Sequence, residues 1–288
     1  MTAALAAEAL RVTEPGLVAG MPEDEYHADP VPAGSLSHSG AKQLLPPSCP
    51  ALFFWHHDHP QQKKEWDFGT AAHKLVLHSG PEIVVVDADS WRTTKAKDEA
   101  KEARERGAVP LLTKDWQAAQ QMADAIRVHP IAGALLDPAT GQPEVSAFWQ
   151  DPDTGIWWRC RYDFLPRDDG SRLLLVDYKS AASADPGKFA KAAADYGYHI
   201  QDAVYTAGAR VLGLDDDPAF LFVVQEKTPP WLVSVVQLDE HARRAGEARA
   251  RKATGIYQDC VASGEWPGYC DDVELISLPA WATRDGDF

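Results

Sequence analysis

The chain has 288 residues, of which 45% are hydrophobic and 25% are charged, and its formal net charge is −15 at pH 7. This length can bury a large core, and the sequence predicts neither a membrane span nor a secretory signal. The acidity disfavours tight non-specific coating of DNA, and four cysteines without a CxxC pair indicate reduced thiols in a cytoplasmic protein and no zinc knuckle.

The first 60 residues carry few core signals. Residues 1–20 have an Ala-rich start and no regular apolar pattern, which predicts a flexible leader. Residues 21–60 are rich in proline and polar turn formers, and they predict a loop-rich N-terminal segment with one or two short helices, one of them capped by Ser37 or Ser39. We expect residues 21–288 to form a single domain.

A helix is predicted over residues 66–79, because small and apolar residues recur on one face at spacings of three and four. The members of this face are Gly69, Ala72, His73, Val76 and Leu77. His73 is either a satisfied core residue or a contact for a metal or a phosphate, and Gly69, one turn earlier, lets a substrate or another backbone come close. A strand is expected over residues 83–86 and an amphipathic helix over 114–128.

Between these last two elements lies a densely charged stretch, residues 91–107. After Arg92 its cations are Lys95, Lys97, Lys101, Arg104 and Arg106, and they are interleaved with acids. Such runs are usually solvated helix faces, yet Lys95 and Lys97 are also candidates for DNA contact. Arg92, together with Trp91, could stack against a DNA end or a splayed base.

Residues 144–150 and 156–165 predict the arms of a β-hairpin around a turn at 151–155. Folding the arms about this turn sets Glu144 roughly opposite Tyr162 and Asp163. Because cross-strand neighbours lie about 5 Å apart, Glu144 and Asp163 can share a site.

The apolar run Leu173–Val176 is typical of a buried strand, and it ends in Asp177-Tyr178-Lys179. Side chains alternate along a strand, so Asp177 and Lys179 point the same way. Burying an acid and a lysine is costly unless something pairs with them, and a divalent cation with a phosphate would do so.

With this strand in place, Glu144, Asp163 and Asp177 are expected to converge beside Lys179. Two or three carboxylates plus a substrate phosphate suit Mg²⁺, which would lower the pKa of a bound water. Lys179 would hold that water or neutralise developing charge. The alternative is an ion pair of Asp177 with Lys179 or Arg161 that serves only the fold.

The C-terminal half predicts a helical region at 187–213, strands at 219–225 and 231–237, a long helix at about 239–263 and an irregular aromatic tail. Gln201 and Tyr205 share a helix face and are either plain core edge or partners of a DNA phosphate. The order of elements predicts an α/β (α+β) core with a central mixed β-sheet flanked by helices.

Together these segments resemble the PD-(D/E)xK nuclease superfamily, with its restriction-endonuclease-like core, and in particular the exonuclease VIII (RecE-type) branch of phage recombination exonucleases. The similar segments are Phe68-Gly69-Thr70-Ala71-Ala72-His73, Glu144, Arg161-Tyr162-Asp163, Val176-Asp177-Tyr178-Lys179-Ser180 and Gln201-Asp202-Ala203-Val204-Tyr205. The stretch from Ser35 to Gly40, followed by Pro50, is also similar, so the resemblance spans about residues 21 to 240.

The resemblance implies roles for the acidic residues. Asp163 and Asp177 would bind the catalytic metal, with the backbone carbonyl of Tyr178 as a further ligand. Lys179 would be the catalytic lysine, and Glu144 the upstream helper acid.

It also implies that His73 lies near a second metal and that Gln201 and Tyr205 position DNA. The expected cofactor is Mg²⁺ or Mn²⁺, with a pair of ions in each active site. The cysteines do not match the four-cysteine pattern of some RecB-like relatives, so no iron–sulfur cluster is expected.

By the same resemblance, the reaction is hydrolysis of double-stranded DNA from the 5′ end, which leaves a 3′ overhang for a single-strand annealing protein in a bacterial or phage-infected cell. Relatives form rings around DNA, which implies a homo-oligomer, a ring-shaped trimer or tetramer. Three alternatives stay open: a RecB-like or Cas4-like single-strand exonuclease or structure-specific endonuclease of the same fold, a non-catalytic DNA-end-binding or capsid-associated protein, and a hydrolase of small phosphates.

Overall fold

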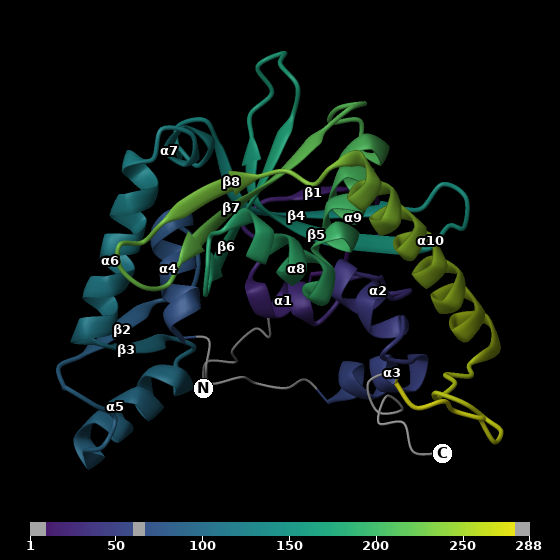
Figure 1. Ribbon diagram of the computed structural model, residues 1–288, viewed down its shortest axis with the longest axis horizontal. Coiled ribbons are helices and arrows are strands. Elements are labelled where there is room, and N and C mark those ends of the chain that lie inside the picture. Colours follow the sequence, from purple (N-terminus) through teal and green to yellow (C-terminus); the bar gives the residue numbers. More distant parts are fainter. Residues whose placement is uncertain (1–9, 60–66, 280–288) are drawn as a thin grey trace, which may run out of the picture.

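A computed structural model describes residues 10–59 and 67–279 of the chain. Its centre is a six-stranded sheet with the strand order β1-β4-β5-β6-β7-β8 (Figure 1). The strands are β1 (Gly16–Val18), β4 (Gly141–Gln150), β5 (Trp157–Pro166), β6 (Leu174–Ala181), β7 (Ala219–Glu226) and β8 (Val233–Val236). Within this six-stranded sheet β6 and β7 pair in parallel and the other neighbouring strands pair antiparallel, so the expected α/β class with a central mixed sheet is confirmed.

Helices cover both faces of the sheet. One face packs against α2 (His38–Leu44), α8 (Pro186–Tyr196), α9 (Tyr198–Val211) and α10 (Glu240–Ser263), and its buried residues include Leu175 of β6. The other face packs against α4 (Asp67–Leu77), α6 (Thr113–Val128) and α7 (Ala132–Leu135), and its buried residues include Val176. Successive residues of β6 thus enter opposite cores, which explains why its sequence is continuously apolar.

A small second layer lies beside α4 and α6, at the lower left of Figure 1. It consists of β2 (Ile83–Val86) and β3 (Val109–Leu112), which pair in parallel, and of α5 (Thr94–Glu105), which connects them. The sequence predicted β2 but not β3, because Pro110 interrupts the apolar pattern of β3. The charged stretch 91–107, described from sequence only by its charge, contains α5.

The N-terminal segment is more ordered than a flexible leader would be. β1 pairs antiparallel with β4, and Val12, Met21 and Tyr26 pack with Phe148 and Trp157 in a buried cluster. Tyr26 belongs to α1 (Glu23–His27). Within the expected leader, Gly16–Val18 therefore form a strand of the sheet and Val12 is buried, while residues 1–9 lie outside the described residues.

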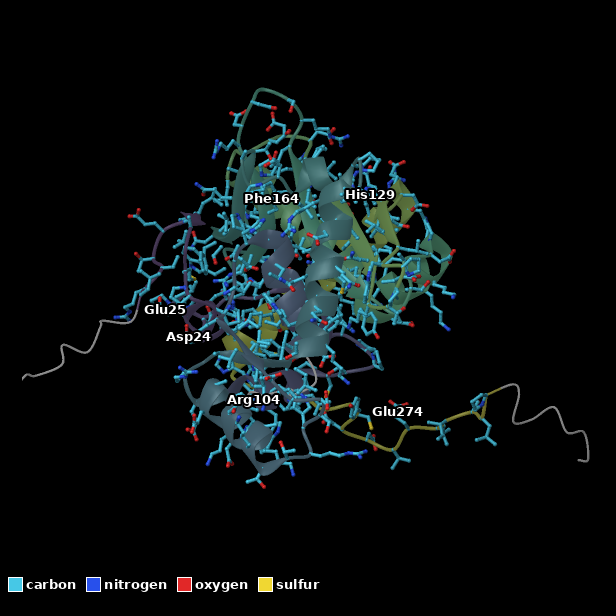
Figure 2. All side chains as sticks on the ribbon, turned by 90° about the vertical axis from the view of Figure 1, so that its left-hand side faces the viewer. Asp24, Glu25, Arg104, His129, Phe164 and Glu274 are labelled. Carbon is cyan, nitrogen blue, oxygen red and sulfur yellow. The ribbon has the colours of Figure 1, made fainter. Side chains whose placement is uncertain are left out.

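After α1 the chain forms α2 and α3 (Pro50–Asp58). Of the two serines considered as caps, Ser37 is the one whose side chain accepts a hydrogen bond at the start of α2, from the backbone N–H of Gly40. The chain after α10 is irregular, as expected, and Figure 2 shows Glu274 on a stretch that leads away from the body. Within the described residues, no helix is long and apolar enough to span a membrane.

Candidate active site

Three side chains from three elements meet beside the C-terminal half of β5. His73 of α4 lies between two carboxylates, with its Nδ1 atom 3.4 Å from Oε1 of Glu144 and its Nε2 atom 3.2 Å from Oδ2 of Asp163. One ligand atom from each residue falls within 4.8 Å of the other two. Among the described residues, this is the group of acids and histidines with the spacing of a metal site.

The hairpin brings Glu144 to Asp163 as the sequence predicted. Pro143 pairs with Phe164 and Val145 pairs with Tyr162, so Glu144 occupies the position that faces Asp163. Its backbone leaves the regular ladder there, because Glu144 has a φ of 53°. A positive φ is uncommon for a residue with a side chain, and it redirects the Glu144 carboxylate toward His73.

β5 and β6 separate next to this group. They pair at Phe164 and Val176 and then diverge, so that the backbone N–H of Tyr178 donates to Oδ2 of Asp163 at 2.9 Å. A backbone donor thus fixes the Asp163 carboxylate. The backbone carbonyl of Tyr178 as a metal ligand stays a prediction.

Asp177 and Lys179 form a second, adjacent pair on β6. The Nζ atom of Lys179 lies 2.6 Å from Oδ2 of Asp177, and it also lies 4.9 Å from the centre of the Tyr198 ring. The side-chain amide of Gln201 donates to Oδ1 of Asp177. Asp177 is 1% exposed, so both of its oxygens are directed to partners inside the protein.

The expected convergence of three carboxylates is therefore only partly seen. Glu144 and Asp163 share the group with His73, whereas the oxygens of Asp177 face Lys179 and Gln201. Asp177 pairs with Lys179 because a buried carboxylate needs a counter-charge. Arg161, the other ion-pair partner considered for Asp177, lies instead 3.5 Å from Oε2 of Glu144.

The charges of the group raise the pKa of its histidine. Burial lowers the pKa of His73, but the carboxylates of Asp163 and Glu144 outweigh it and raise the pKa to about 9. Burial and then Asp163 raise the pKa of Glu144 to about 7, and the same two causes raise that of Asp177 to about 6. Burial opposes ionisation of Asp163 as well, but His73 and Lys179 hold its pKa below the usual value.

These residues fit a hard divalent cation. They supply an imidazole and carboxylate oxygens at a partly buried position. Burial and the nearby Asp163 carboxylate raise the pKa of Glu144, and a bound cation would favour the ionised form of that acid. A bound cation would displace the proton that the raised pKa of His73 favours on its imidazole ring.

Gln201 and Tyr205 of α9 were expected to contact DNA. Gln201 is 2% exposed and Tyr205 is 5% exposed, and the Tyr205 ring packs edge-on against Tyr162 at 5.5 Å between ring centres. The structure places Gln201 against Asp177, and DNA contact by Gln201 or Tyr205 stays a prediction.

The ring of His38 lies 5.6 Å from that of Tyr205. The sequence did not single out His38, whose position as the first residue of the capped helix α2 carried no chemical signal.

The cations expected to contact DNA lie in and before α5, which packs on β2 and β3. Figure 2 places Arg104 of α5 far below Phe164, the neighbour of Asp163. Lys95 lies 3.7 Å from Glu99 in the same helix. Arg92 and Lys97 are exposed, and their contact with DNA stays a prediction.

Comparison with solved structures shows the same fold. A crystal structure from Eubacterium rectale named "Putative exonuclease" superposes with a TM-score of 0.58, at 13% identity, over 93% of this chain and 99% of that chain. The structure of SSO0001, also at 13% identity, gives a TM-score of only 0.29 over 67% of this chain and 85% of that chain, too low to support an argument.

No curated protein matches the chain. A family model described as "PDDEXK-like domain of unknown function (DUF3799)" matches residues 37–279, which is most of the 288 residues. PDDEXK nucleases use divalent metals, which agrees with the acidic group around His73. The chain belongs to this PDDEXK-like family.

Proposed function

We propose that this protein is a metal-dependent exodeoxyribonuclease of the RecE-type branch, which resects linear duplex DNA from the 5′ end and leaves 3′ overhangs for recombination. The observation that carries the proposal is the juxtaposition of the His73–Glu144–Asp163 group with the Asp177–Lys179 pair at the place where β5 and β6 diverge. The PDDEXK-like family and the fold shared with the Eubacterium rectale protein support a nuclease.

The proposed chemistry divides between the two groups. His73, Glu144 and Asp163 would hold Mg²⁺ or Mn²⁺, which when bound activates a water and offsets charge on the phosphate. Lys179 presents its ammonium beside them, held by Asp177 and the Tyr198 ring, and would stabilise negative charge that develops on the phosphate oxygens. Gln201 orients Asp177 by a hydrogen bond and so keeps Lys179 in place.

The decisive experiment is digestion of linear duplex DNA labelled at either end, with Mg²⁺ or Mn²⁺ and with or without chelator. We expect labelled 5′ nucleotides to be released first, and no digestion with chelator. Release of 3′ labels first, or digestion only of single strands, would indicate the RecB-like or Cas4-like alternative. Slower migration of the DNA in a native gel, without cleavage, would indicate an end-binding protein. Cleavage of small phosphate esters but not of DNA would refute a DNA enzyme.

Substitutions of the lysine and its partner test the assignment. Lys179→Gln and Asp177→Asn should each lower the rate about 100-fold or more, as expected when one preorganised charge is removed from an active site. Circular dichroism should show folded protein. A variant with wild-type digestion would refute the role of that residue.

We also propose a ring-shaped homo-oligomer, a trimer or tetramer that threads the duplex, and a single-strand annealing protein as partner. A ring would confine DNA contact to a channel inside a chain whose net charge is −15. Light scattering of the purified protein tests the oligomer, and a monomer that digests DNA processively would refute it.

A further inference from the structure

Glu144 holds an unusual backbone conformation that needs support from its surroundings. Its φ is 53° in the middle of a ten-residue strand, between two regular pairs of the β4–β5 ladder. Such a conformation costs of order 1–3 kcal/mol for a residue with a side chain, and it persists where neighbouring groups hold it.

Arg161 of β5 contacts Oε2 of Glu144, whereas His73 contacts Oε1. One terminal nitrogen lies 3.5 Å from Oε2 of Glu144, Nε donates to Oγ of Ser146 at 3.2 Å, and the other terminal nitrogen donates to the backbone carbonyls of Met21 and Pro22. The Arg161 side chain is only 12% exposed.

The N-terminal segment fixes this arginine. The Arg161 guanidinium lies 4.8 Å from the centre of the Tyr26 ring, and Tyr26 is itself buried against Phe148. Met21 and Tyr26 precede residue 37, where the match to the family begins. Because the nitrogens of Arg161 already have protein partners, this arginine is suited to hold Glu144 rather than to bind a DNA phosphate.

We propose that Arg161 is a positioning residue that keeps the Glu144 carboxylate directed toward His73 and Asp163, and that the N-terminal segment takes part in metal binding through Arg161. This inference rests on the proposed metal site. Arg161 acts as an outer partner of a metal ligand, and loss of such a partner commonly weakens metal binding about 10- to 100-fold.

Arg159 provides a matched control. It lies two residues away on the same side of β5, its side chain is also 12% exposed, and its guanidinium lies 5.6 Å from the same Tyr26 ring. Its partners are Asp29 and Ser35, and Glu144 is not among them.

The test is calorimetric titration of the full chain with Mn²⁺, without DNA. We expect Arg161→Gln to weaken Mn²⁺ binding about tenfold or more, and Arg159→Gln to leave it within about twofold even where both variants lower the melting temperature. Excess Mn²⁺ should restore digestion by the Arg161→Gln variant, but not by the Lys179→Gln variant.

Equal Mn²⁺ affinity in the two arginine variants would overturn the inference and leave the proposed function standing. Absence of Mn²⁺ binding by the unchanged protein would overturn both. If Arg161→Gln does not fold, the test uses Tyr26→Leu, which removes the aromatic ring next to the Arg161 guanidinium. Unchanged Mn²⁺ affinity in that variant would likewise refute the role of Arg161.

Discussion

At the scale of single residues, His73 is the group whose charge depends most on its surroundings. It lies between two carboxylates that raise its pKa to about 9, so without metal it is protonated at neutral pH. A metal must displace that proton, and Mn²⁺ affinity should therefore increase as pH rises toward 9.

The same histidine predicts how the stability of the metal-free protein depends on pH. Its pKa is higher in the folded protein than the ordinary 6.5, so its contribution is fully present below pH 6.5 and is lost as pH rises through about 9. Urea unfolding in chelator should give a free energy of unfolding that falls across this window. The fall should be smaller in His73→Gln, and an equal fall in both proteins would contradict the pKa shift.

Gln201 gives a prediction about orientation. Gln201→Leu removes the donor to the buried Asp177 and should lower the free energy of unfolding by about 1–3 kcal/mol. It should also lower the rate of DNA digestion, measured at a temperature where the variant is folded.

The control for this variant is Gln225→Leu. Gln225 lies on β7, next to β6, and is as buried as Gln201. It accepts a hydrogen bond from the hydroxyl of Tyr178 and donates one to the backbone carbonyl of Met122, and neither is Asp177. We expect Gln225→Leu to lower the free energy of unfolding about as much as Gln201→Leu does, without a similar loss in the rate of DNA digestion. Equal loss of rate in both variants would make Gln201 an ordinary core residue.

The sequence predicts part of this site for clear reasons. The hairpin fixes the separation of Glu144 and Asp163, and strand alternation places Asp177 with Lys179. It does not predict the positive φ of Glu144 or the pairing of Asp177 with Gln201, because both depend on contacts between segments far apart in the chain.

At the scale of elements, the crossing of α9 and α10 positions Gln201. A Cβ atom added at Gly246 of α10 would lie 1.9 Å from the carbonyl oxygen of His199 in α9. Gly246→Ala must therefore separate the two helices, and overpacking of this kind costs typically about 1–3 kcal/mol. Thermal unfolding should show a lower melting temperature, and DNA digestion should slow because α9 carries Gln201.

Gly255 of the same helix is the matched control for this substitution. A Cβ atom there meets nothing within 4 Å, so Gly255→Ala should leave stability unchanged or raise it by up to about 1 kcal/mol. If Gly246→Ala proved as stable as Gly255→Ala, the close helix approach would be wrong.

Elements with strong local signals are those that the sequence predicts well. Residues 83–86 form a strand with the expected bounds, and the hairpin arms and the long C-terminal helix agree to within a few residues. The short strands β1 and β3 were missed, because β1 has only three residues and Pro110 interrupts the apolar pattern of β3.

At the scale of the whole molecule, the distribution of charged side chains determines where an acidic protein can bind DNA. α5 has four cations and four acids, so it has no net charge, and Lys95 and Lys101 each pair within the helix. The expected DNA contact of this segment therefore depends on the exposed residues Arg92 and Lys97.

Salt dependence of binding tests this contact. If both residues touch phosphates, the double variant Arg92→Gln/Lys97→Gln should bind duplex DNA more weakly in chelator, with a salt slope reduced by about one for each contact. Lys95→Gln, which removes a charge already paired with Glu99, should have a smaller effect. An unchanged salt slope in the double variant would show that Arg92 and Lys97 do not contact DNA phosphates.

The divergence of β5 and β6 has a practical consequence. The amide hydrogen of Tyr178 is bonded to the Asp163 carboxylate instead of to a neighbouring strand. In a nuclear magnetic resonance spectrum, that single amide would register any ion or proton arriving at Asp163 as a change in chemical shift and in solvent exchange. This amide therefore reports occupancy of the site in isotope-enriched protein, without any probe attached to a side chain.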